Sequence, residues 1–277
     1  MIDKRIIEEN FSKHARDYDQ HSRVQNLCAS RLINEIDSNR YNNILDIGCG
    51  TGNYTKLLRD KFPKAKIKAV DISAKMIEVA KEKLGDERIE FIVADAESLN
   101  LEEEFDLISS NASFQWFQDL KSDLIRYKQA LKRGGFILFS TFGPETFSQL
   151  HSCLEEFLGK PLAITASNFL GKEKLEGILK AIFSEVEVKE EVYNQNYNSL
   201  LELLENLRCT GTRGDGLKGE IFWTPQKVAS IEEIYKKKFP APAKGWSQPE
   251  AGQPLTEDSG RKNIVATYQI FFCRGTK

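Results

Sequence analysis

The sequence predicts a doubly wound α/β fold with a mostly parallel sheet of seven strands. Short segments rich in apolar and β-branched residues alternate with helical patterns between residues 42 and 142. These segments lack a strict apolar-polar alternation, as expected when helices cover both faces of a parallel sheet. Three glycines, Gly48, Gly50 and Gly52, follow the first segment directly, where such a sheet turns into its first helix.

The elements follow one another in a regular order. We expect strands at 42–48, 67–73, 89–95, 105–111 and 135–142, with helices at 53–62, 74–84 and 120–132. The helix at 120–132 has apolar residues at helical spacing, and Gly134 and Gly135 indicate its end. Two more strands, at 184–193 and 264–272, complete the sheet. Helical patterns at 199–208 and 225–239 do not fit the alternation and predict an appended cap.

Composition and charge exclude several classes of protein. The 277 residues are 40% hydrophobic and 29% charged, which is ordinary for a globular chain. A formal net charge of −2 argues against a general electrostatic grip on nucleic acid. No apolar run approaches the roughly 20 residues of a membrane-spanning helix, so we expect a cytoplasmic protein without a membrane partner. The five cysteines are scattered, so neither disulfides nor a metal site is indicated.

The glycine loop indicates a ligand. Its pattern is G-x-G-x-G, and Asn53 stands where the dinucleotide fingerprint G-x-G-x-x-G has its third glycine. With Asp46 before it, this tighter loop suits a ligand that bears an amino acid and a cationic centre rather than phosphates. The alternative is a tight turn between strand and helix with no ligand.

Two more carboxylates end successive strands. Asp71 lies 19 residues after Gly52, where an acidic residue can accept hydrogen bonds from both ribose hydroxyls. Its alternative role is to cap the next helix, although Ser73 already suits that purpose. Asp95 ends the third strand, where it can meet an adenine amino group, with Leu99 flanking the ring; alternatively it is a turn aspartate.

The segments ILDIGCGTG, AVDIS, IVADAESL, FDLISSN and LKRGGFILFS, in this order and spacing, resemble the class I S-adenosylmethionine-dependent methyltransferases. The resemblance covers residues 40–142. It implies S-adenosylmethionine as cofactor, with the glycine loop against its methionine part, Asp71 on the ribose, and Asp95 with Ala96 beside the adenine. The cofactor-binding residues so implied are Asp46, Gly48, Gly50, Gly52, Asp71, Ile72, Asp95, Ala96 and Asn111.

A more particular resemblance lies outside that core. The segments FSKHARDYDQHSRVQ (11–25), SSNASFQWFQDL (109–120) and TFGPETFSQLH (141–151), and more loosely LLENLRCTGTRG and ATYQIFF, resemble the malonyl-acyl-carrier-protein O-methyltransferases of biotin synthesis. That family implies methylation of the free carboxylate of a malonyl thioester, on an acidic carrier protein or on coenzyme A, to start pimeloyl synthesis. SNASFQW is shared with methyltransferases of small diacids such as trans-aconitate, so that activity stays open. A non-catalytic protein that binds S-adenosylmethionine is the other alternative.

The expected chemistry needs no general base, because a carboxylate is already an ionised nucleophile at pH 7. It needs donors that position the acceptor, for which the candidates are Tyr18, Asn111, Gln115, Trp116, Arg208 and Arg213. Each has a simpler alternative. Tyr18 lies at helical spacing from Phe11 and Ala15 and can be core, as can Trp116; Asn111 can shape a turn. Most arginines are solvated.

These patterns divide the chain into three parts. Residues 1–40 form an N-terminal helical lid, and residues 41–143 form the Rossmann-like cofactor-binding core. Residues 144–277 complete the sheet and carry the helical cap. Within them, residues 241–263 are rich in proline, glycine and polar residues, which predicts a flexible loop.

Overall fold

A computed structural model describes residues 3–37, 41–85, 87–101, 104–211, 223–240 and 264–277. Two sequence predictions, the loop at 241–263 and the role of Arg213, lie outside these residues. No helix in the described part of the chain is long and apolar enough to cross a membrane.

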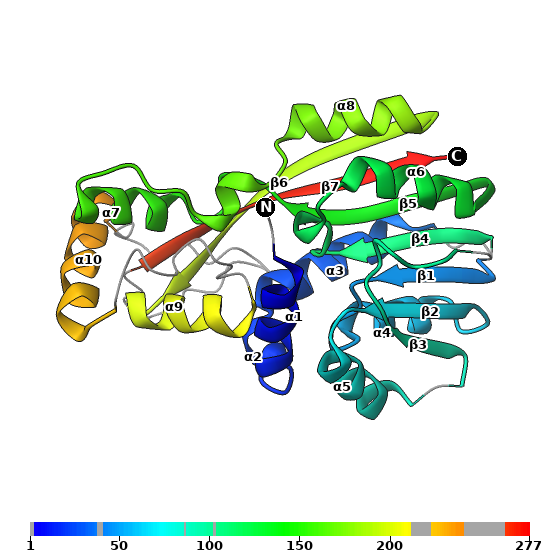
Figure 1. The fold of residues 1–277 in the computed structure, drawn as a ribbon, viewed down its shortest axis with the longest axis horizontal. Coiled ribbons are helices and arrows are strands. Elements are labelled where there is room, and N and C mark those ends of the chain that lie inside the picture. Colours follow the sequence, from blue (N-terminus) through cyan, green and yellow to red (C-terminus); the bar gives the residue numbers. More distant parts are fainter. Residues whose placement is uncertain (1–2, 38–40, 86, 102–103, 212–222, 241–263) are drawn as a thin grey trace.

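One seven-stranded sheet organises the molecule, with the order β3-β2-β1-β4-β5-β7-β6 (Figure 1). Strands β1 to β5 pair in parallel, and β7 runs antiparallel between β5 and β6. The strands are β1 (Asn43–Ile47), β2 (Lys66–Asp71), β3 (Ile89–Val93), β4 (Phe105–Asn111), β5 (Leu131–Phe142), β6 (Glu185–Tyr197) and β7 (Ile264–Thr276). The predicted fold class is confirmed, and the last strand in sequence is not the edge of the sheet.

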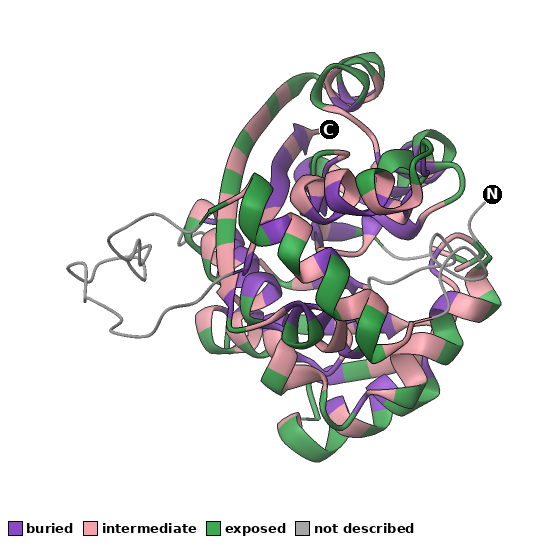
Figure 2. Ribbon diagram, turned by 90° about the vertical axis from the view of Figure 1, so that its left-hand side faces the viewer, coloured by how far each residue is buried: buried purple, intermediate pink, exposed green. Residues whose placement is uncertain are grey.

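Both faces of the sheet are covered. On β1, Ile44 packs into one hydrophobic cluster, whereas Leu45 and Ile47 pack into another. Figure 2 shows the buried residues along the strands and on the inner sides of the helices. Residues of α3 (Arg23–Glu35) and α4 (Asn53–Lys61) belong to the first cluster, and those of α6 (Leu120–Ala130) and α8 (Lys172–Ile182) belong to the second. This two-sided burial explains why the strand sequences are continuously apolar.

Helix α6 ends earlier than the sequence predicts. Its last residue is Ala130, because Leu131 is already extended and pairs with Phe105 of β4. Gly134, with φ +76°, therefore lies inside the irregular start of β5 and does not end the helix. A long-range strand pairing has overridden the local helical pattern.

The N-terminal segment is broken into short helices. Helix α1 (Lys4–Lys13) stops at His14, and α2 (Tyr18–His21) starts after a turn in which the Asp17 amide donates to the His14 carbonyl. The single helix suggested by the spacing of Phe11, Ala15 and Tyr18 is therefore absent from these residues.

The C-terminal strands are long and reach beyond the main sheet. In Figure 1, β6 and β7 extend as a ribbon toward α7 (Ser148–Leu158), α9 (Leu200–Cys209) and α10 (Pro225–Lys238). Helix α9 starts at its Ser199 cap and α10 at its Thr224 cap, within one residue of the predicted bounds. These helices pack at the far end of the ribbon, away from β1 to β3.

Candidate active site

A small cavity of about 100 Å³ lies at the carboxyl ends of β1, β2 and β4. Its walls come from α1, α2, the loops after β1 and β3, and η1 (Phe114–Trp116). Ligands bind at this edge in open parallel sheets. Seven of the nine predicted cofactor residues line it: Gly48, Gly50, Asp71, Ile72, Asp95, Ala96 and Asn111.

The loop after β1 keeps space open for a ligand. Gly50 has φ +54°, and a Cβ added there would meet no atom within 4 Å, so it would enter open space at the cavity wall. Gly48 has φ +69°, and a Cβ there would lie 2.1 Å from Ser113 Oγ. The first glycine thus allows the loop to pack on η1, and the second allows a ligand to approach the backbone.

Asp46 and Gly52 do not line the cavity. A Cβ on Gly52 would lie 2.9 Å from Leu84 Cδ1, so this glycine serves the packing of α4 on α5 (Ala74–Leu84). Asp46 is 1% exposed and accepts a hydrogen bond from Thr55 Oγ1 at 2.6 Å. Its other oxygen has no hydrogen-bond partner among the described residues, and burial raises the pKa of this carboxyl to about 7.

Asp71 holds the loop and faces the cavity. Its two oxygens accept the amide hydrogens of Gly50 at 2.9 Å and Ser73 at 2.8 Å. Ser73 caps α5 as predicted, because its hydroxyl accepts the Met76 amide. Burial raises the pKa of Asp71 to about 6. A carboxylate offers about four lone-pair sites, so two remain for ribose hydroxyls.

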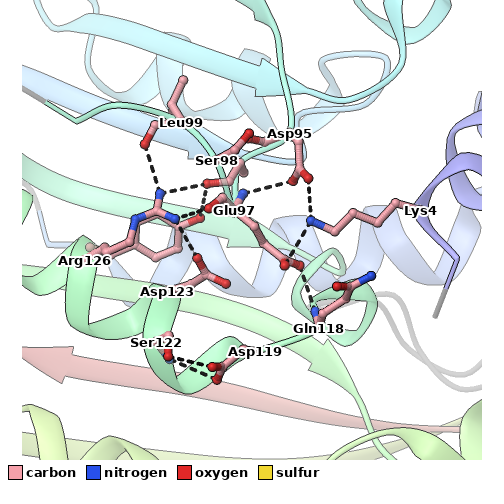
Figure 3. Close-up of polar contacts among 12 residues, drawn as sticks. Lys4, Asp95, Glu97, Ser98, Leu99, Gln118, Asp119, Ser122, Asp123 and Arg126 are labelled. Carbon is pink, nitrogen blue, oxygen red and sulfur yellow. Dashed lines mark hydrogen bonds and ion pairs between the residues drawn. The ribbon is translucent and has the colours of Figure 1, made fainter. Parts of the chain in front are cut away.

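The loop after β3 is tied to α1 by Lys4 (Figure 3). Lys4 Nζ lies 2.5 Å from Asp95 Oδ2 and 3.0 Å from Glu97 Oε2. The side chains are 22% exposed for Lys4 and 33% for Asp95. Lys4 was not anticipated from the sequence, and its ion pair covers the carboxylate predicted to meet adenine.

Helix α6 fixes the same loop from the other side. Arg126 donates to the carbonyls of Ala96, Glu97 and Leu99 and pairs with Asp123 (Figure 3). The Leu99 side chain packs in a hydrophobic cluster and is not among the described residues that line the cavity; its contact with adenine stays a prediction. Ile72, Met76 and Phe117 supply apolar wall instead.

Aromatic rings close the cavity from the N-terminal side. Tyr18 lines the wall, and its ring centroid lies 6.1 Å from that of Phe11, which packs edge-on against Trp116 at 6.2 Å. Burial raises the pKa of Tyr18, so its hydroxyl keeps its proton and can donate. Tyr18 and Trp116 are thus both packing residues and wall residues.

Asn111 ends β4 at the cavity. Its carbonyl oxygen accepts from Ser140 Oγ at 2.8 Å, and its amide donates to the Gln25 carbonyl at 3.0 Å. The next residue, Ala112, has φ +51°. Asn111 therefore joins β4, β5 and α3 and shapes the turn, while one side faces the cavity.

A larger cavity of about 680 Å³ adjoins the first one. The two share Ile7, Trp116 and Phe117 as wall residues. Gln115 lines the larger cavity; it donates to the Ala112 carbonyl at 2.7 Å and accepts from Thr141 Oγ1 at 3.3 Å. The predicted positioning residues are therefore divided, with Tyr18 and Asn111 on one side of Trp116 and Gln115 on the other.

Comparison with known proteins identifies the family. Residues 45–139 match the family described as a methyltransferase domain. A malonyl-(acyl-carrier protein) O-methyltransferase of Priestia megaterium is 48% identical over 156 residues, or 55% of this chain and 57% of that relative. The malonyl-(acyl-carrier protein) O-methyltransferase 2 of Ilyobacter polytropus is 36% identical over 241 residues, or 86% of this chain and 92% of that relative. This chain belongs to the malonyl-(acyl-carrier protein) O-methyltransferase family.

One solved structure is similar to this chain in its fold. The YcgJ protein of Bacillus subtilis aligns with a TM-score of 0.58 at 15% identity, over 90% of this chain and 97% of that one. The alignment supports the doubly wound architecture derived from the strand order.

Arg208 is the predicted positioning residue that the structure does not bring to either cavity. It lies on α9, its side chain is 48% exposed, and its guanidinium pairs with Glu205. Arg208 is not among the described residues that line either cavity. Its role in this O-methyltransferase family member stays a prediction.

Proposed function

We propose that this chain transfers a methyl group from S-adenosylmethionine to the free carboxylate of malonyl-acyl-carrier protein, which starts pimeloyl synthesis for biotin. The observation that supports this most is a glycine-lined cofactor cavity that shares a wall with a larger cavity, in a chain whose relatives carry this name. The alternatives, esterification of a small free diacid and non-catalytic cofactor binding, draw no support from those relatives. We expect the enzyme to act in the cytoplasm and without nucleic acid.

The residues of the small cavity fit the cofactor. Gly50 leaves room beside the backbone, and the carboxylate of Asp71 can accept further hydrogen bonds from a ligand. When bound, S-adenosylmethionine supplies an electrophilic methyl group on a sulfonium, which is a good leaving group. The chain's own task is to orient the acceptor and to exclude water.

We expect most of the rate acceleration to come from the alignment of the acceptor oxygen with the methyl group and the sulfur. Holding two reactants in line contributes roughly 7 to 11 kcal/mol. No general base is needed, since the malonyl carboxylate is ionised at pH 7. Neutral donors near Trp116, among them Gln115 and the protonated Tyr18 hydroxyl, can fix the carboxylate without quenching its nucleophilicity.

We infer that α1 and α2 act as a lid over the small cavity. About 100 Å³ is less than the range of about 300 to 1,000 Å³ typical of sites for drug-sized ligands. Lys4 on α1 pairs with Asp95, and Asp19 on α2 pairs with Lys83 at 2.6 Å and accepts from Thr51 at 2.5 Å. These polar contacts can break and reform, so displacement of α1 and α2 would make room for the cofactor.

The experiment is intact-mass analysis of malonyl-acyl-carrier protein after incubation with the enzyme and S-adenosylmethionine. We expect the carrier to gain one methyl group, and carrier without the malonyl group to gain none. Free malonate is tested in parallel. Methylation of free malonate but not of the carrier would contradict the proposed function, and so would the absence of any methyl transfer by enzyme that binds the cofactor.

A further inference from the structure

The larger cavity is a chamber with a mostly apolar interior and a polar rim. Its apolar wall includes Phe114, Leu120, Ile164, Phe169, Leu175 and Ile178, contributed by η1, α6, α8 and the segment around η2 (Thr165–Asn168). The buried polar side chains in this wall are Gln115 and Thr141. A volume of about 680 Å³ suits a ligand of drug size. A free three-carbon diacid would leave most of it unfilled and would find no buried cation among its described lining residues.

Charged side chains of both signs stand at the exposed rim of this chamber. Lys121 on α6 and Lys174 on α8 line the cavity and are exposed. Two carboxylates also line it, but both are engaged as helix caps: Asp3 accepts the Arg5 amide, and Asp119 accepts the amide and hydroxyl of Ser122. Capping does not remove the charge of the two carboxylates, but the lysines are the cationic donors that line the rim and could meet a phosphate.

We propose that the larger cavity holds the phosphopantetheine arm of the acceptor, with the malonyl end toward Gln115 and Trp116 and the phosphate at Lys121 and Lys174. This rests on the proposed function, since it assigns a site to the arm of that substrate. The arm is amphipathic, with two amides and a hydroxyl on an otherwise apolar chain, which matches a wall that is mostly apolar inside and has Gln118, Thr165 and Asn168 nearer the rim. The wall shared through Trp116 sets the malonyl end beside the cofactor cavity.

The arm is common to carrier protein and coenzyme A, so the test compares three acceptors: malonyl-acyl-carrier protein, malonyl-coenzyme A and malonyl-N-acetylcysteamine, which lacks the distal arm. Ile178→Trp narrows the chamber. Its matched control is Glu173→Trp on the exposed side of the same helix. We expect Ile178→Trp to lower kcat/KM about tenfold or more for both full-arm acceptors, with much less effect on the short thioester and unchanged cofactor affinity.

Lys174→Glu tests the role of the rim, and Lys172→Glu is its matched control. Both lysines are exposed on α8, and of the two only Lys174 lines the cavity. We expect Lys174→Glu to raise KM for both full-arm acceptors, with kcat unchanged, and Lys172→Glu to change neither.

Equal kcat/KM in Ile178→Trp and wild type on the full-arm acceptors would overturn the site. If Ile178→Trp fails to bind the cofactor, Ala163→Trp at the exposed rim provides the same obstruction. An equal fall in kcat/KM for the short thioester and for the full-arm acceptors would also overturn the proposed site, because the variant's effect would then not depend on the arm. Wild-type enzyme that methylates none of the three acceptors would instead refute the proposed function.

Discussion

The smaller and larger cavities share Ile7, Trp116 and Phe117, yet they are built in different ways. In the smaller cavity, loop backbone after β1 to β4 forms the part next to the sheet, and side chains of α1, α2 and η1 close it. The larger is shaped by side chains from segments far apart in the sequence, around residues 3–7, 114–121, 163–170 and 174–178. The smaller, backbone-shaped cavity should therefore be sensitive to substitution at a few glycines. The larger, side-chain-shaped cavity can change its ligand specificity through single side-chain substitutions.

The largest expected effect tests the backbone-shaped cavity. Gly50→Val should weaken S-adenosylmethionine binding by about a hundredfold or more, because a branched side chain would enter the ligand's space and resist φ +54°. Calorimetry measures the affinity. The matched control is Gly159→Val, which has the same backbone strain at φ +65° but lies at the end of α7. Unchanged affinity in folded Gly50→Val protein would show that the loop does not touch the cofactor.

Asp71→Ala should weaken cofactor binding by roughly 1 to 3 kcal/mol, the cost of leaving a hydrogen-bond site unpaired. The variant also removes acceptors for the amides of Gly50 and Ser73, so the loop loses support. Titration calorimetry is compared with that of Asp60→Ala, an exposed carboxylate on α4. Equal affinities in the two folded variants would rule out a ribose contact at Asp71.

The cofactor half of the molecule was readily predicted from the sequence because its signals are local. The glycine loop, Ser73 as the cap of α5, and Asp71 at the end of β2 each follow from a few neighbouring residues; Asp95 lies two residues beyond the end of β3, in a turn where it accepts the Glu97 amide. Strand and helix bounds between residues 42 and 130 agree within about two residues.

The remaining features depend on contacts between distant segments. Lys4 meets Asp95 across 91 positions, and nothing in its neighbours marks it. Gly52 looks like a ligand-binding glycine but serves the packing of Leu84. The wall around Ile178 exists only because α8 lies beside η1 and η2, which no local pattern specifies.

The third prediction concerns pH and the buried carboxylate under the loop. Asp46 has a folded-state pKa near 7 and an ordinary value of 3.8, so the folded state retains a proton that the unfolded chain releases between these values. The contribution of Asp46 to the free energy of unfolding is therefore greatest below pH 3.8. It falls as pH rises to about 7, by up to about 1.4 kcal/mol per pH unit. Thermal melts of the cofactor-free protein from pH 5 to 8 should show this fall. In Asp46→Asn the slope should flatten, and an unchanged slope would assign the effect to other groups.

Lys4→Met should tighten cofactor binding by up to about fivefold, since a partly buried ion pair contributes at most about 1 kcal/mol. The pair with Asp95 closes α1 over a cavity of only about 100 Å³, so its removal favours the open state. Stopped-flow binding should show faster association, and Lys13→Met on the same helix is the control. Weaker binding with faster dissociation would instead mean that Lys4 closes over the bound cofactor.

The smallest effect on activity is expected at Arg208, which lies on α9 outside the described lining of the larger cavity. Arg208 pairs with Glu205 on its own helix at an exposed position and is not among the described residues that line either cavity. Arg208→Lys should therefore change kcat/KM for the malonyl acceptor by less than about twofold. Gln115→Leu, which removes a donor and an acceptor inside the larger cavity, should lower it about tenfold with cofactor affinity intact. A tenfold loss in Arg208→Lys would require α9 to move toward the acceptor during the reaction, because no described contact joins Arg208 to either cavity. That result would support Arg208 as a residue that positions the carboxylate, because a guanidinium offers paired donors in a geometry that lysine cannot reproduce.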